Sequence, residues 1–126
     1  MRDLIILTDK PITYESIIDV IRKKFKKYNF YRDDEDLIYI KKKSSGFELE
    51  LTPNDILDDP NNMMDDTIER CPNKKAYLTN LNYSTLYIAK KVISLIINNY
   101  GSMWIQSDED DDFFGTAQEF LDNYNY

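Results

Sequence analysis

Residues 76–105 read AYLTNLNYSTLYIAKKVISLIINNYGSMWI, and this stretch decides the fold. The β-favouring residues 76–81 predict a strand. Apolar residues then recur every three or four positions, which predicts an amphipathic helix from Ser84, its N-cap, to about Tyr100, with Gly101 as the residue after its end. Its apolar face is expected to contain Leu86, Ala89, Val92, Ile93, Ile96 and Ile97. Residues 103–105, Met-Trp-Ile, predict a second short strand.

The N-terminal half predicts a similar order of elements. Residues 4–7 form a continuous apolar run, which is typical of a strand buried on both faces. A helix is expected from its N-cap Thr13 to about Tyr28, with apolar residues on one side and lysines crowding its last turns. Residues 37–40 and 47–51 read as two strands of a hairpin, and the strict apolar–acidic alternation of 47–51 predicts that one face of the sheet is solvated.

Together these elements predict an α+β fold. The expected sheet is mainly antiparallel with two helices on one face, a split βαβ-like arrangement, plus a short C-terminal helix. That last helix is expected to open with a capping box formed by Thr116 and Glu119. Residues 52–75 have no sustained period and are expected to be irregular. Because no Gly/Ser/Pro-rich linker interrupts the pattern, residues 1–126 are expected to form a single domain.

The composition excludes several kinds of chemistry. The chain has no histidine, so histidine-activated nucleophiles and histidine metal ligands are impossible within it. Three glycines are too few for a glycine-rich phosphate loop, and the single Cys71 excludes an internal disulfide. We therefore expect no catalytic residue, no metal and no cofactor, and we expect that the protein is not an enzyme. The first residues are too short an apolar run, and too acidic, for a secretion signal, so a cytoplasmic location without membrane attachment is expected.

Charge is unevenly distributed along the chain. Of the net charge of −7, residues 1–50 contribute +1 and residues 51–126 contribute −8. The lysine triplet 41–43 and the basic end of the first helix suggest nucleic acid binding, but a chain of this net charge repels phosphate overall. Nucleic acid is therefore not expected as a partner.

An acidic block is the sharpest feature of the sequence. It consists of Asp108, Glu109, Asp110, Asp111 and Asp112. Positions one, three, five and twelve of an EF-hand calcium loop would be filled by Asp108, Asp110, Asp112 and Glu119. Phe113 replaces the glycine expected at position six, Gly115 replaces the apolar residue at position eight, and a strand rather than a helix precedes the block. These departures favour a charged loop, and calcium binding is left open.

Two aromatic residues and a second acidic stretch complete the predicted partner-binding surface. Phe113 and Phe114 follow the acidic block directly, and acidic groups beside exposed aromatics suit the binding of a basic protein. The alternative is that at least one of the two phenylalanines packs into the core. The second stretch lies in the irregular segment and includes Asp58, Asp59, Asp65 and Asp66. It would either extend the acidic surface or form a solvated loop.

The C-terminal third resembles a known group of proteins. Residues 100–105, Tyr-Gly-Ser-Met-Trp-Ile, an acidic turn and residues 116–121, Thr-Ala-Gln-Glu-Phe-Leu, resemble the ends of bacterial immunity proteins of polymorphic toxin systems. The likeness covers about the last 45 residues and includes no catalytic motif. It implies a cytoplasmic inhibitor that occludes a cognate toxin domain.

The leading hypothesis is therefore a non-catalytic immunity protein, a monomer or weak homodimer. It is expected to bind a basic toxin domain, with a nuclease as the first candidate, through residues 108–114 and 55–69. The alternative is a regulatory or small-ligand-binding module of ferredoxin-like topology, with its ligand on the sheet face or at a dimer edge. An enzyme that works with carboxylates alone is a third interpretation.

Overall fold

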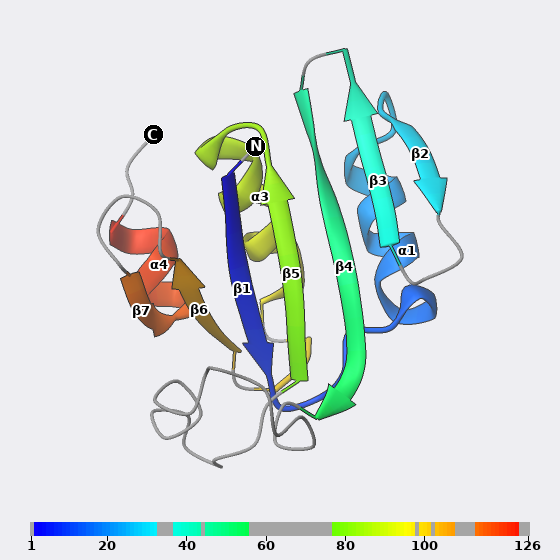
Figure 1. The fold of residues 1–126 in the computed structure, drawn as a ribbon. Helices are drawn as coiled ribbons and strands as arrows, with labels where there is room; N and C mark the ends of the chain where they lie inside the picture. The colour runs from blue at the N-terminus through cyan, green and yellow to red at the C-terminus, as the bar shows by residue number, and fades with distance from the viewer. Residues whose placement is uncertain are drawn as a thin grey trace.

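The computed structural model describes residues 2–32, 37–43, 45–55, 77–97, 99–101, 103–107 and 113–123, without the side chains of 52–55 and 123. The described residues form one antiparallel sheet with helices packed on one of its faces (Figure 1). The elements are β1 (Arg2–Thr8), α1 (Tyr14–Lys24), β2 (Asn29–Arg32), β3 (Leu37–Lys42), β4 (Ser45–Asp55), β5 (Tyr77–Tyr83), α3 (Leu86–Ile96), β6 (Met103–Ser107), β7 (Phe113–Thr116) and α4 (Ala117–Asn123).

The sheet has seven strands in the order β2-β3-β4-β5-β1-β6-β7. Every neighbouring pair is antiparallel. Because β5 and β6 both run antiparallel to β1, they are parallel to each other, and α3 connects them while β1 lies between them. This is a split βαβ unit. The predicted fold class, an α+β fold with a mainly antiparallel sheet and a short C-terminal helix, is confirmed.

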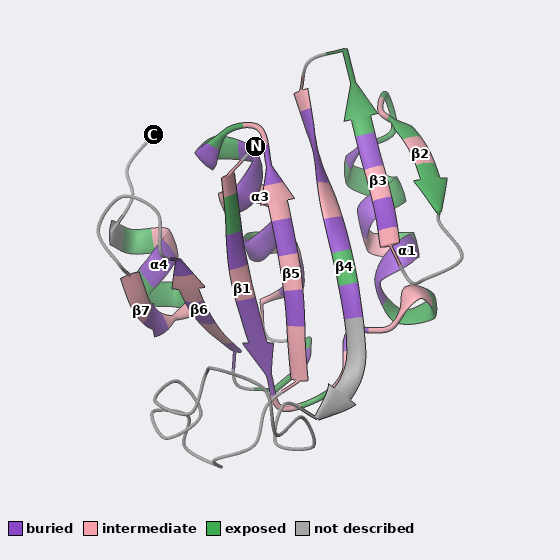
Figure 2. Ribbon diagram, viewed as in Figure 1, coloured by how far each residue is buried: buried purple, intermediate pink, exposed green. Residues whose placement is uncertain are grey.

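The main core lies between the sheet and its helices. Burial alternates along the strands, as Figure 2 shows, because successive side chains point to opposite faces. Phe47 and Leu49 of β4 are fully buried under the helices, and the Phe47 ring packs on that of Phe25 with centroids 4.9 Å apart. The predicted inner faces of the two long helices are also buried, at Ile17, Ile18, Ile21, Leu86, Ala89, Val92, Ile93 and Ile96.

The N-cap of α3 is Thr85, whereas the sequence pattern had predicted Ser84. The Thr85 side chain accepts a hydrogen bond from the backbone N–H of Ile88. Ser84 instead bridges to β4: its hydroxyl accepts a bond from the N–H of Gly46 at 3.0 Å, and its own N–H donates to the carbonyl of Gly46 at 3.0 Å. The tertiary contact therefore determines the role of Ser84.

Both long helices end one turn earlier than predicted. α3 ends at Ile96, because Ile97 has an extended ψ of 136°. Tyr100, the predicted helix end, is buried and shares a hydrogen bond of 2.9 Å with the hydroxyl of Ser16 in α1. α1 ends at Lys24. Its predicted N-cap Thr13 is confirmed, and the capping box of α4 between Thr116 and Glu119 is also confirmed, with both hydrogen bonds at 3.1 Å.

Two edge strands were not predicted from the sequence. β2 pairs with β3 at one edge and β7 pairs with β6 at the other. Each strand has only four residues, which is too short for a period to be recognised. β2 is held by contacts with α1: the Arg32 guanidinium lies 3.7 Å from the ring centroid of Tyr14, and that of Arg22 lies 5.1 Å from the ring of Phe30.

Candidate protein-binding face

The candidate site is the face of the sheet that carries no described helix. We call it the helix-free face. Among the described elements, α1, α3 and α4 all lie behind the sheet as seen in Figure 1. Strand alternation and pairing register place on the helix-free face the side chains of Asp3, Ile5, Leu7, Tyr31, Leu37, Tyr39, Lys41, Glu48, Glu50, Leu78, Asn80, Asn82, Trp104, Gln106 and Phe114.

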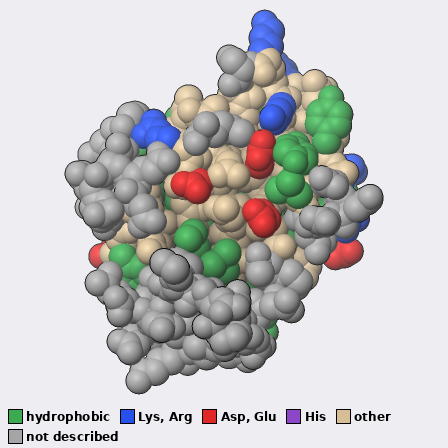
Figure 3. Space-filling model, in the orientation of Figure 1, with side chains coloured by type: hydrophobic (Ala, Val, Ile, Leu, Met, Phe, Trp, Pro, Cys, Tyr) green, Lys and Arg blue, Asp and Glu red, His purple; other side chains and the backbone are tan. Residues whose placement is uncertain are grey.

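The middle of the helix-free face is acidic. Glu48 and Asp3 belong to one cross-strand row, and Glu50 lies in the next row along β4. Asp3 and Glu50 are exposed, and neither has an ion pair among the described residues. Glu48 pairs with Lys41, whose Nζ lies 3.5 Å from Oε1 of Glu48. Figure 3 shows acidic side chains near the centre of this face, with hydrophobic side chains beside them.

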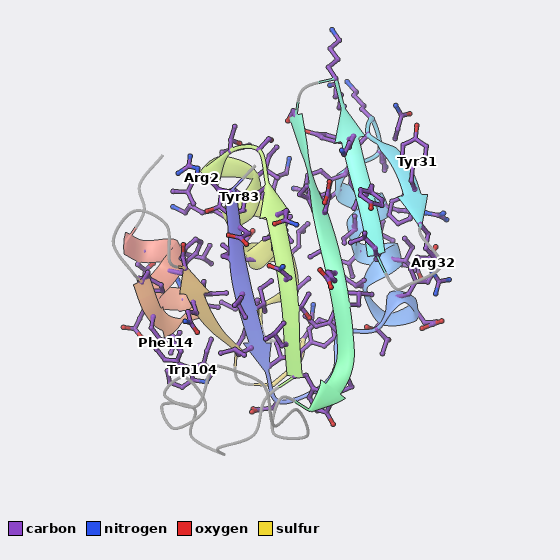
Figure 4. All side chains as sticks on the ribbon, viewed as in Figure 1. Arg2, Tyr31, Arg32, Tyr83, Trp104 and Phe114 are labelled. Atoms are coloured by element: carbon purple, nitrogen blue, oxygen red, sulfur yellow. The ribbon has the colours of Figure 1, made fainter. Side chains whose placement is uncertain are left out.

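One end of the helix-free face is apolar and aromatic. Leu7 is fully buried there, and Ile5, Leu78, Trp104 and Phe114 pack around it as a cluster separate from the main core. The rings of Trp104 and Phe114 stack with centroids 5.7 Å apart and an interplanar angle of 22°. Figure 4 shows the two side chains together at the β6–β7 edge. Tryptophan is enriched in protein-binding hot spots, and carboxylates on the same face can pair with the basic residues of a partner.

Two buried polar atoms on this face have no hydrogen-bond partner among the described residues. They are the indole nitrogen of Trp104 and the side-chain carbonyl oxygen of Asn80. A buried donor or acceptor without a partner costs free energy, since it has lost its bonds to water. Both atoms are shielded from solvent, so a protein that binds this face does not reach them unless the surrounding side chains move.

The predicted anchors Phe113 and Phe114 point to opposite faces of the sheet. The Phe113 ring packs against the core residue Phe120, with centroids 5.5 Å apart and planes at 66°. Phe114 lies on the helix-free face against Trp104. The alternative that one of the two phenylalanines belongs to the core is therefore confirmed for Phe113, because adjacent residues in a strand alternate between faces.

The predicted acidic segments lie outside the described residues. These segments contain Asp108, Glu109, Asp110, Asp111 and Asp112, which link β6 to β7 along the chain, and Asp58, Asp59, Asp65 and Asp66, which link β4 to β5. The acidic residues at the centre of the face, Asp3, Glu48 and Glu50, were not predicted as site residues. The alternation of residues 47–51 carried the signal for Glu48 and Glu50, because it predicted an acidic, solvated face.

The described residues bear on metal binding and membrane insertion as follows. No group of three His, Cys, Asp or Glu side chains among them is arranged to hold a metal ion. No helix in the described part of the chain is both long and apolar enough to cross a membrane.

A cleft of about 560 Å³ lies beside the aromatic end, where Asp9, just after β1, and the start of β6 meet α4. Trp104 and Met103 form apolar walls, and Asp9 and Gln118 contribute polar groups. The positive φ of 76° at Gly101 brings its backbone against the Asp9 side chain, so that an added Cβ would lie 3.0 Å from the carboxylate. The cleft can hold a small molecule or one side chain of a partner protein.

Comparison with known proteins finds no matching family model, no matching curated protein and no matching solved structure.

Proposed function

We propose that this chain is a non-catalytic inhibitor of the immunity-protein type, which binds a basic toxin domain and occludes it. A nuclease is the first candidate for that domain, because nucleases carry basic surfaces that attract phosphate. The observation that carries the proposal is the helix-free face, which combines the exposed carboxylates of Asp3 and Glu50 with a stacked Trp104–Phe114 pair. The cytoplasm is the proposed location, as the resemblance of the C-terminal third implies.

The carboxylates of the helix-free face supply attraction and orientation. Asp3 and Glu50 are exposed and without an ion pair among the described residues, so a partner's lysines or arginines can approach them without first breaking a bridge. Complementary charges of this kind raise the association rate and suppress wrong partners more than they raise affinity. The acidic residues 108–112, which link β6 to β7, and the second acidic segment are proposed to extend the same negative surface.

The aromatic end supplies the affinity. Trp104 and Phe114 are only partly buried, and they already pack against the buried Leu7, so little side-chain entropy is lost when a partner covers them. Preorganised aromatic side chains surrounded by polar groups are the usual composition of a binding hot spot. We propose that the partner inserts apolar side chains against this pair while its basic residues meet the carboxylates.

The proposal is tested by co-expression in cells. The reading frame next to this gene is expressed with and without the present chain, and growth is followed. The expected result is that the neighbour arrests growth and that this chain restores it. A neighbour that is harmless, or that kills in the presence of this chain as well, contradicts the proposal.

Variants of matched charge then test the face. Glu50→Lys reverses a carboxylate on the helix-free face, and Asp19→Lys reverses an exposed carboxylate of α1 on the other side of the sheet. Rescue is expected to weaken with Glu50→Lys and to persist with Asp19→Lys. Equal rescue by the two variants would contradict the use of the helix-free face.

A small-ligand-binding module is the second candidate function, and the cleft beside Trp104 favours it. Its size and its mixture of apolar walls with Asp9 and Gln118 suit a compact polar ligand. Native mass spectrometry of the purified chain distinguishes the two functions. A bound small molecule that is lost in Trp104→Ala supports the module, whereas ligand-free protein that rescues growth supports the inhibitor.

A further inference from the structure

A groove of about 480 Å³ runs over the helix layer, on the side of the sheet opposite to the helix-free face. α1, α3 and α4 contribute to it, and its walls are Lys24, Tyr87, Lys90, Lys91, Ser94 and Leu121. Four of these residues, at positions 87, 90, 91 and 94, form one stripe along α3, because residues three and four apart share a face of a helix. The stripe is polar and basic, whereas the opposite side of α3 is buried in the core.

The chain segments that supply the lysines of the groove are basic in sequence. α3 contains no acidic residue, and every charged residue between Val20 and Arg32 is a lysine or an arginine. In α4, Asp122 follows the groove residue Leu121, and its carboxylate accepts a hydrogen bond of 3.0 Å from the side-chain amide of Gln118.

An exposed aromatic ring lies among these cations. Tyr87 is 61% exposed, which makes it and Tyr31 the two strongly exposed large hydrophobic residues of the described chain. The Lys91 ammonium lies 5.9 Å from the Tyr87 ring centroid and 5.1 Å from that of Phe25. The ring is therefore available for stacking on a planar ligand, with a cation beside it.

We infer that this groove binds single-stranded nucleic acid. A row of lysines can follow a phosphate backbone, and a flat aromatic ring beside them can stack on a base, which is the combination used by proteins that bind single strands. An acidic protein segment would use the lysines but would leave the exposed ring of Tyr87 without a planar partner. The lysines of the groove, Lys24, Lys90 and Lys91, are spread over two helices, so a chain of phosphates suits the groove better than a compact anion.

The net charge of −7 argued against a nucleic acid partner at the level of the whole chain. A local site depends instead on the charges within about a Debye length, which is about 8 Å at physiological salt. Within the described structure, the acidic face and the basic groove lie on opposite sides of the sheet. This inference therefore does not rest on the proposed inhibitor function, and either can fail alone.

The test is fluorescence anisotropy of a short labelled oligothymidylate titrated with the full chain at several salt concentrations. Tyr87→Ala is expected to weaken binding about tenfold, and Tyr87→Phe, which keeps the ring, is expected to bind like the wild type. Lys24→Gln and Lys91→Gln are each expected to reduce the slope of log affinity against log salt by about 0.7. Tyr31→Ala, at a tyrosine of 58% exposure, and Lys10→Gln, at an exposed lysine, are the matched controls outside the groove.

Three results would overturn the inference. The first is the absence of binding at low salt. The second is an equal loss of affinity in the control variants and in the groove variants. The third is displacement of the oligonucleotide by a polyglutamate peptide of the same length as effectively as by unlabelled oligothymidylate, because the groove would then be a site for acidic protein segments.

Discussion

Two buried threonines on the same face of the sheet should respond in opposite ways to the same substitution. Thr79 in β5 and Thr8 in β1 are both 1% exposed and both face the helices. The hydroxyl of Thr8 donates a hydrogen bond of 2.6 Å to the carbonyl of Lys10, whereas the hydroxyl of Thr79 has no partner among the described residues. Valine keeps the shape of threonine and removes the hydroxyl, so the two variants isolate the contribution of that group.

The surroundings of Thr79 set the expected size of the effect. Its cross-strand neighbours are Ile6 and Leu51, which are both buried and apolar. A buried polar group without a partner costs about 1–3 kcal/mol, so Thr79→Val is expected to raise the free energy of unfolding by about 1–2 kcal/mol. Thr8→Val loses the hydrogen bond to the carbonyl of Lys10 and is expected to lower the free energy of unfolding by about 1 kcal/mol. Thr79→Ser keeps the unsatisfied hydroxyl, loses a methyl group and is expected to lower it by about 1 kcal/mol.

Urea unfolding measures all three variants. Trp104 is the only tryptophan of the chain and serves as the intrinsic fluorescent probe. Thr79→Val is expected to have the highest urea midpoint, followed by the wild type, and Thr8→Val and Thr79→Ser are expected to have lower midpoints than the wild type. If Thr79→Val unfolded at a lower urea concentration than the wild type, the hydroxyl of Thr79 would be making a favourable interaction and the reasoning would be refuted.

Three other substitutions test separate parts of the structure. Gly46→Ala is expected to lower the free energy of unfolding by about 2 kcal/mol, because Gly46 has a φ of 152° and an added Cβ would overlap the backbone of β3. An unchanged urea midpoint would refute this expected loss of stability. Thr116→Ala removes the side chain that caps α4 by accepting a hydrogen bond from the N–H of Glu119. It is expected to lower the free energy of unfolding, measured by thermal unfolding, by about 1 kcal/mol. Phe113→Ala is expected to lower the free energy of unfolding by about 2 kcal/mol, because it removes a ring that packs against the core residue Phe120. Phe114→Ala is expected to lower it by about 1 kcal/mol and to alter the fluorescence of the stacked Trp104. Equal losses of stability and an unaltered spectrum would contradict the assignment of the two rings to opposite faces.

The fold class was predictable because long apolar periods determine it. The inner stripes of α1 and α3 recur at helical spacing, and the alternation of residues 47–51 separates a buried face from a solvated one. Element boundaries were less predictable, because tertiary contacts set them. Ser84 is a good N-cap by residue type, but its hydrogen bonds to Gly46 tie the residue to β4, and Thr85 caps α3 instead. A local pattern carries no information about such a contact.

The candidate site was harder to predict than the fold. The sequence points to contiguous acidic runs, but the helix-free face is assembled across strands, so that Asp3 and Glu48 share a row although they lie far apart in the chain. Strand order is what brings such residues together, and short strands such as β2 and β7 leave no periodic signal of that order. The pairing of Trp104 with Phe114 likewise follows from the β6–β7 register.

The most direct test of the inhibitor proposal is the association rate between this chain and the purified product of the neighbouring reading frame, measured at low and high salt. The double variant Glu48→Gln/Glu50→Gln is expected to associate about fivefold more slowly than the wild type at low salt, and the difference should shrink at high salt. Asp19→Asn, which changes a carboxylate of α1, is expected to associate at the wild-type rate. The absence of a complex, or an equal slowing by Asp19→Asn, would contradict the claim that the helix-free face binds a basic toxin.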